Sequence, residues 1–133
     1  MKRQEAPERF NKRRVGLGCE DLVCDYLKKR GVLIKDRNYK AHRGNEIDIV
    51  GMDRMGTWLC IEVKYRRNAG AGSPAESVDI RKQYAICRAF DHYRLYRKIP
   101  FEAPVRFDVV AVTGSDTSDI RWIKNAFDYC LRG

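Results

Sequence analysis

The 133-residue chain has no apolar run that approaches the ~20 residues needed to cross a bilayer. Its N-terminus is charged from the start and lacks the apolar segment typical of a signal peptide. Internal repeats and low-complexity tracts are also missing, and the length suits one domain with a single hydrophobic core. These absences argue against a helical membrane protein or a secreted precursor, and we expect a cytoplasmic protein with one folded domain.

Cysteine use gives no sign of a disulfide framework or a zinc site. The five cysteines are odd in number, lie in apolar stretches and include no C-x-x-C pair. Cys19 and Cys24 are five residues apart and would point to different sides of a helix, which argues against a common zinc ion. We therefore predict buried, reduced thiols that pack as small hydrophobic side chains.

Acidic residues are scarce relative to basic ones, with 18 Asp and Glu against 27 Lys and Arg, for a net charge of +9. An excess of this size favours polyanionic partners, nucleic acid first. Residues 1–15 are especially basic and hold few apolar side chains, which predicts a flexible basic arm ahead of a domain at 16–133. A solvated tail without a role is the alternative. The arm includes Arg13 and Arg14, both candidates for contact with nucleic acid.

Two strand-like runs carry acids, which strands and buried positions both disfavour. Asp48 lies in the run 46–50, and Glu62 and Lys64 lie in the run 58–65 after a Gly-containing hairpin loop at 51–56. The period of two puts Cys60, Glu62 and Lys64 on one face of the second run, opposite Leu59 and Ile61. In the first run it puts Asp48 opposite Ile47 and Ile49, and Asp48 joins Glu62 and Lys64 if the two strands register. Such a face could hold a divalent cation beside a phosphodiester, or it could be an exposed face with ordinary ion pairs.

A first helix is predicted from about Gly16 to Arg30, with Gly31 as the residue that ends it. Glu20 falls within its apolar stripe, where an acid is costly unless a metal or a buried cation compensates for it. The alternative for Glu20 is a favourable interaction with the helix dipole. The stripe consists of Cys19, Leu22, Val23, Tyr26 and Leu27.

A second helix is predicted to begin at Ser73 as its N-cap, with Pro74 and Glu76 completing a capping box, and to run to about Arg97. Lys82 lies on its inward side, either near the acids or as a lysine whose stem packs while its amine stays in water. The residues expected to face inward are Val78, Ala85, Ile86, Ala89, Phe90, Tyr93 and Tyr96.

The remaining patterns complete an α-β-β-β-α-β-β order. A strand is predicted over 32–40 and a turn over 42–45, which contains Arg43. A basic Gly-rich loop at 66–72 begins with Arg66 and Arg67, which suit phosphate contacts or plain solvated surface. A central strand is predicted over 105–112, a last strand over 120–123, and a turn or short helix over 126–131.

This pattern resembles the PD-(D/E)XK phosphodiesterase superfamily and, more narrowly, the YraN-like family of predicted endonucleases. The resemblance runs from about residue 16 to 127 and implies a restriction-endonuclease-like α/β core, a mixed sheet flanked by helices. The family is similar in outline to archaeal Holliday-junction resolvases, which leaves a homodimer open. The matching elements are Gly18-x-Glu20, Tyr26-Leu27, Gly31, Asn38-Tyr39, Glu46-Ile47-Asp48, Ile61 to Arg66, Pro74-x-Glu76-x-Val78, Lys82 and Arg106 to Val109.

The residues and the resemblance together predict a metal-dependent endonuclease that acts on DNA rather than RNA, with branched or structured DNA as one option. Mg²⁺, with Mn²⁺ as a substitute, would take oxygen ligands from Glu20, Asp48, Glu62 and the Val63 carbonyl. Asp48, Glu62, Lys64 and Lys82 are the predicted catalytic residues. Predicted nucleic-acid contacts are Arg43, Arg66, Arg67, Arg13 and Arg14. The alternative is a non-catalytic nucleic-acid-binding protein that keeps the fold.

Overall fold

The computed structural model of the chain describes residues 12–67, 78–114 and 119–130. Its elements follow the predicted α-β-β-β-α-β-β order, and the sheet is mixed, so the α/β restriction-endonuclease-like core is confirmed. The helices and strands are α1 (Lys12–Lys29), β1 (Leu33–Lys40), β2 (Glu46–Met52), β3 (Trp58–Arg66), α2 (Ile80–Arg97), β4 (Val105–Thr113) and β5 (Asp119–Phe127), with a 3-10 turn η1 (His42–Gly44) between β1 and β2.

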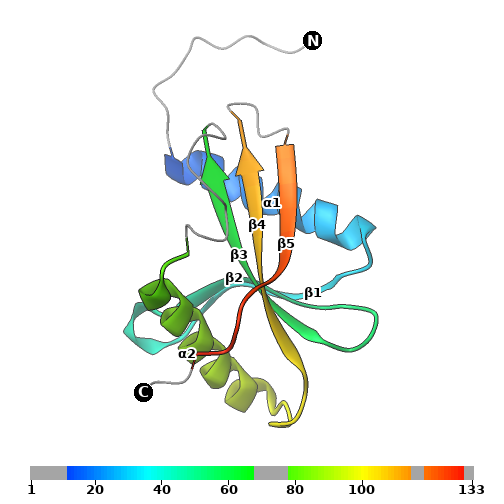
Figure 1. The fold of residues 1–133 in the computed structure, drawn as a ribbon, viewed down its shortest axis with the longest axis vertical. Helices are drawn as coiled ribbons and strands as arrows, with labels where there is room; N and C mark the ends of the chain where they lie inside the picture. The colour runs from blue at the N-terminus through cyan, green and yellow to red at the C-terminus, as the bar shows by residue number, and fades with distance from the viewer. Residues whose placement is uncertain (1–11, 68–77, 115–118, 131–133) are drawn as a thin grey trace.

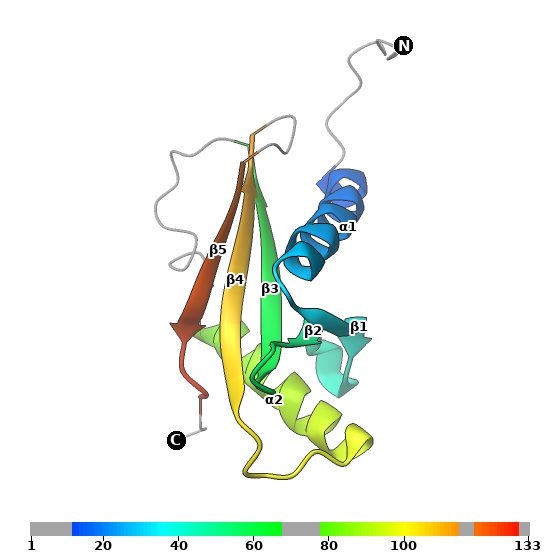
Figure 2. The same cartoon turned by 90° about the vertical axis from the view of Figure 1, so that its right-hand side faces the viewer.

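The five strands lie in the sheet in chain order, from β1 to β5. Neighbouring strands are antiparallel except for β3 and β4, which are parallel and are connected through α2. Figure 1 shows β1 and β2 running across the direction of β3, β4 and β5, and Figure 2 shows α1 beside the latter strands. The sheet is therefore strongly twisted at its β2–β3 junction.

Each helix covers one face of the sheet. Cys19, Val23 and Leu27 of α1 pack with Ile49 and Ile61 on one face. On the opposite face, α2 packs with β2, β3 and β4 through a second buried cluster that includes Val50, Cys60, Ile86, Phe90 and Tyr93. Alternation along β3 produces this division, since Leu59 and Ile61 face α1 while Cys60 faces α2.

The β2–β3 ladder runs from Met52 with Trp58 to Ile49 with Ile61. Asp48 and Glu62 are the next residues on the two strands, at the point where the strands separate. Strict alternation along β2 also fails here, because Ile47 packs on the α2 face and Ile49 on the α1 face. The prediction that Ile47 and Ile49 share one face is therefore wrong. Asn38 on the neighbouring strand has a positive φ of 52° nearby, which marks the same distortion.

The start of α2 corrects the predicted capping box. The helix begins at Ile80, and the Asp79 side chain caps it by accepting a hydrogen bond from the Lys82 backbone N–H at 2.9 Å. Val78 is buried but lies before the helix. Ser73, Pro74 and Glu76 lie outside the described residues. Aspartate is as good an N-cap as serine, so the sequence contains two possible N-cap residues for this helix. In the structure the N-cap is Asp79.

The remaining boundaries are close to the predicted ones. The first helix begins at Lys12 rather than near Gly16, and Gly31, with φ of 93°, follows its end as predicted. Strand β5 continues to Phe127, so the predicted turn or helix from 126 is wrong there. Leu22 and Tyr96 are exposed rather than inward, whereas Cys24 and Cys87 are buried.

The cysteine prediction is confirmed where the structure describes these residues. All five thiols are free, four of them are buried, and Cys130 is partly buried.

Neither helix in the described parts of the chain is both long and apolar enough to cross a membrane.

Candidate metal and phosphodiester site

Asp48 and Glu62 form a close carboxyl pair where β2 and β3 separate. The Val63 backbone N–H donates a hydrogen bond of 2.8 Å to Asp48 Oδ2, which fixes that carboxyl against β3. Glu62 is buried, with 6% of its surface exposed. Its Oε1 atom is buried and has no hydrogen-bond partner among the described residues. A buried carboxylate oxygen in this state is costly unless a proton or a cation reaches it.

Two lysines approach Glu62 from different elements. Lys64 Nζ lies 3.9 Å from Glu62 Oε2, and Lys82 Nζ lies 3.8 Å from the same oxygen. Lys64 lies two residues after Glu62 on β3, as the period of two requires, whereas Lys82 comes from the first turn of α2. Asp79 therefore has a positioning effect here, since it sets where that turn begins. The structure thus brings together all four residues predicted to be catalytic.

Glu20 reaches the same region from α1, on the other face of the sheet. Its side chain is largely buried, with Oε1 at 3.9 Å from Arg37 Nη2. Arg37 is held more tightly by Asp21, at 2.9 Å. Burial raises the pKa of Glu20, and the negative charge of Asp48 raises it further, while a hydrogen bond with Asn38 and the charge of Arg37 lower it. Glu20 therefore belongs to the electrostatic surroundings of Asp48.

The carboxyl pair binds protons more strongly than isolated acids do. Burial raises the pKa of Glu62 to about 7, and the charge of Asp48 raises it as well, against the opposing effects of Lys82 and Lys64. Burial likewise raises the pKa of Asp48, although the Val63 hydrogen bond and Lys82 lower it. Perturbed acids of this kind are a frequent property of functional sites.

The residues present fit a magnesium-type ion that keeps part of its water shell. The described residues contain no group of three or more His, Cys, Asp or Glu side chains placed to hold a metal by themselves. Mg²⁺, however, is commonly held by one or two carboxylates together with substrate oxygens and water. Asp48 and Glu62 supply two such carboxylates, and Glu62 Oε1 has no hydrogen-bond partner among the described residues.

The predicted nucleic-acid contacts are distributed over several places. Arg43 is exposed on η1 with φ of 65°. Arg66 and Arg67 follow Lys64 at the end of β3, where Arg66 is partly buried and Arg67 is exposed. Arg13 and Arg14 lie in the first turn of α1, and their side chains lie outside the described ones.

Sequence reasoning did not name Arg37, and it named Asn38 only within a matched element, not as a partner of Glu20. The pattern offers little signal for them, because they lie in a polar part of β1 whose pairing with α1 depends on tertiary contacts. The positive φ of Asn38, 52°, is a conformation that asparagine adopts more readily than most residues. It is a local signal that the matched Asn38-Tyr39 element contained.

The element order and the mixed sheet define the class of protein as an α/β domain with a restriction-endonuclease-like core. A buried carboxyl pair with two nearby lysines lies where two of its strands separate. The chain belongs to the uncharacterised protein family UPF0102, whose model matches residues 19–112, which confirms the YraN-like resemblance.

Curated relatives cover almost the whole chain. A UPF0102 protein of Lachnoclostridium phytofermentans is 42% identical over 119 residues, which is 90% of this chain and 97% of the relative. One from Methylibium petroleiphilum is 40% identical over 119 residues, covering 86% and 93% of the two chains. Among solved structures, a repair endonuclease from Pyrococcus abyssi matches 86% of this chain and 42% of its own length, with 18% identity and a TM-score of 0.38.

Proposed function

We propose that this protein is a metal-dependent endonuclease that hydrolyses phosphodiester bonds of DNA, with Asp48 and Glu62 as its central acids. The observation that carries the proposal is the buried Asp48–Glu62 pair, whose Glu62 Oε1 has no hydrogen-bond partner among the described residues and whose two pKa values are raised. The two lysines approach Oε2 of Glu62, which leaves Oε1 open to a cation or to a proton shared with Asp48. A carboxyl pair that binds a cation beside a phosphate would give Glu62 Oε1 its partner.

Asp48, Glu62 and the Val63 carbonyl would hold Mg²⁺ or Mn²⁺, with Glu20 as a further carboxylate at the edge of the site. When bound, such an ion lowers the pKa of a coordinated water and offsets charge on the phosphate. The Val63 N–H keeps Asp48 oriented toward β3. Glu62 in its deprotonated form completes the ligand set.

Lys64 and Lys82 supply positive charge beside the second carboxylate oxygen of Glu62, Oε2. Both amines lie just under 4 Å from Glu62 Oε2, at 3.9 and 3.8 Å, and both side chains are partly exposed. They can therefore leave Glu62 for a phosphate oxygen without breaking a tight hydrogen bond. In that position Lys64 would orient the attacking water or stabilise the developing anion, and Lys82 would hold the phosphate.

The alternative is a nucleic-acid-binding protein that keeps this fold without cleaving. The net charge of +9 favours it as much as it favours the nuclease. The two functions differ in what a metal ion does, since binding through phosphate contacts alone needs none.

Purified wild-type protein is expected to cut a fluorescently labelled DNA panel of linear, flapped and four-way junction substrates in Mg²⁺ or Mn²⁺. Cleavage should stop in EDTA and should follow the protein peak across a final sizing column. Salt-dependent binding of the same DNAs without cleavage in either metal would instead establish the non-catalytic alternative.

A further inference from the structure

We infer that the groove between η1 and α2 binds a single-stranded segment of nucleic acid next to the carboxyl pair. This rests on the proposed function and deepens it, since it names the class of substrate. The groove has a volume of about 790 Å³. One wall is formed by η1 with the following Asn45, and the other by α2 residues between Arg81 and Leu95.

The groove is positively charged. Three arginines and one aspartate line it, a net charge of +2 with neutral histidines (three minus one). Arg43 and Arg81 are exposed, on opposite walls of the groove. Asp91 is already engaged, because Arg88 Nε donates to its Oδ2 at 2.9 Å and the Tyr129 hydroxyl donates to its Oδ1 at 2.8 Å. The acid therefore does little to repel a phosphate chain.

Aromatic rings alternate with these charges. Tyr84 lines the α2 wall, and His42 and His92 meet across the groove with ring centroids 4.9 Å apart. A hydrogen bond between the Tyr39 hydroxyl and Nδ1 holds the His92 ring in place. Bases stack on such rings only when they are unpaired and turned outward. Rings set between cations thus favour a single strand over a duplex, which would present only its phosphates here.

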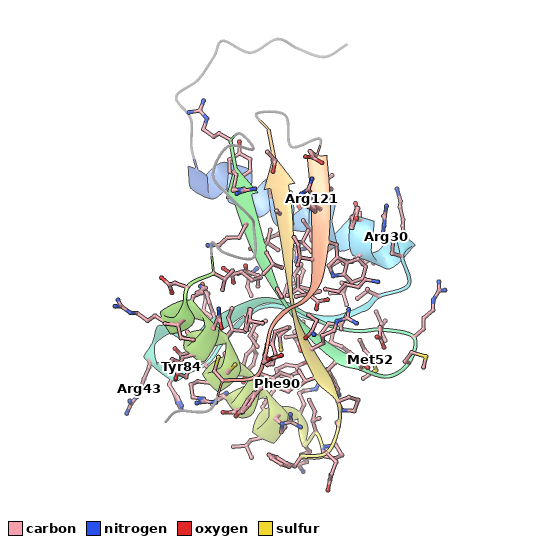
Figure 3. The ribbon with its side chains drawn as sticks, in the orientation of Figure 1. Arg30, Arg43, Met52, Tyr84, Phe90 and Arg121 are labelled. Carbon is pink, nitrogen blue, oxygen red and sulfur yellow. The ribbon has the colours of Figure 1, made fainter. Side chains whose placement is uncertain are left out.

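Both walls of the groove contain residues that lie close in the chain to the carboxyl site. Arg81 immediately precedes Lys82, whose amine lies 3.8 Å from Glu62 Oε2, and Asn45 immediately precedes β2, the strand that carries Asp48. Figure 3 shows Arg43 and Tyr84 on the same side of the molecule. At ~1.5 Å rise per helical residue, the stretch of α2 from Arg81 to Leu95 is roughly 21 Å long. A strand of about six stacked nucleotides, at 3.4 Å each, matches that length.

The test is fluorescence anisotropy with a labelled ten-nucleotide deoxythymidine strand in EDTA, which prevents metal-dependent cleavage. Arg43→Asn with Arg81→Gln removes two groove charges, and asparagine suits the positive φ at position 43. Tyr84→Leu removes the ring but keeps apolar bulk. Arg54→Gln with Arg121→Gln removes two exposed charges outside the groove and is the matched control.

We expect the groove double variant to weaken single-strand binding about tenfold and to reduce the slope of log Kd against log salt by about 1.4, twice the value of ~0.7 for one contact. Tyr84→Leu should weaken it about fivefold or more, and the control should bind nearly as wild type does. Equal losses in the control and the groove variants would overturn the inference. So would an undiminished affinity of Tyr84→Leu, or a wild-type preference for duplex. An oligouridine probe then tells RNA from DNA as the source of the strand.

This binding test is independent of whether the carboxyl pair cuts DNA. If no metal supports cleavage but the groove variants lose affinity, the proposed catalysis fails and the groove stands. If cleavage proceeds but the groove variants bind the single strand as wild type does, the groove fails and the catalytic proposal stands.

Discussion

Replacing Glu62 with glutamine is expected to lower metal-dependent DNA cleavage by about 10²–10³-fold, the loss typical for one group that stabilises a transition state electrostatically. The amide has the shape of the carboxyl group but cannot carry the negative charge that holds a cation. The fold should be retained, because the variant removes a buried acid whose Oε1 has no hydrogen-bond partner among the described residues. Initial cleavage rates at saturating metal provide the measurement.

The control for this substitution is Glu102→Gln, at an exposed position in the connector between α2 and β4. It removes the same charge far along the chain from the carboxyl pair and should cleave at the wild-type rate. Wild-type cleavage by Glu62→Gln would place the activity elsewhere in the protein or in a contaminant. A loss shared equally by Glu102→Gln would point to net charge rather than to a site.

The free energy of unfolding of the metal-free protein is expected to fall as the pH rises from about 5 to 8. The pKa of Glu62 is about 7 in the folded chain and is 4.5 for an ordinary glutamate. Between these values the folded state binds more protons than the unfolded state does, so its advantage is complete below 4.5 and is lost through 7. The shift of about 2.5 pH units corresponds to at most roughly 3–4 kcal/mol, at about 1.4 kcal/mol per pH unit.

Urea unfolding at several pH values, in EDTA, measures this dependence. Subtracting the profile of Glu62→Gln from that of wild type isolates the contribution of Glu62 from other groups that titrate in the same range. The difference should shrink or reverse at pH 8 when Mg²⁺ is added, since the cation replaces the proton. Parallel profiles for the two proteins would mean that the Glu62 carboxyl is not perturbed by folding.

Local sequence patterns predicted the strands of the site well. The alternation of Cys60, Glu62 and Lys64 against Leu59 and Ile61 placed them on the faces where the structure has them. The face that each side chain occupies determines what it packs against, and successive side chains of a strand alternate between the two faces.

Features that depend on two elements at once were harder to predict. The pairing of Asp48 with Glu62 needed the register of β2 and β3, and the failure of alternation at Ile47 comes from the sheet twist. The start of α2 at Asp79 was ambiguous because two caps were available. The groove was missed because Arg81 and Tyr84 form no motif, and η1 brings Arg43 to them only in the folded chain.

The most direct test of the account is calorimetric titration of Mn²⁺ into the wild-type protein and Asp48→Asn, at matched low ionic strength and pH 8. At this pH the Glu62 carboxyl, with its pKa of about 7, is mostly deprotonated and ready to bind a cation. We predict a saturable heat of Mn²⁺ binding in wild type that Asp48→Asn lacks. Equal binding by both proteins, or no binding by wild type with and without a non-cleavable DNA, would contradict a metal site at Asp48 and Glu62.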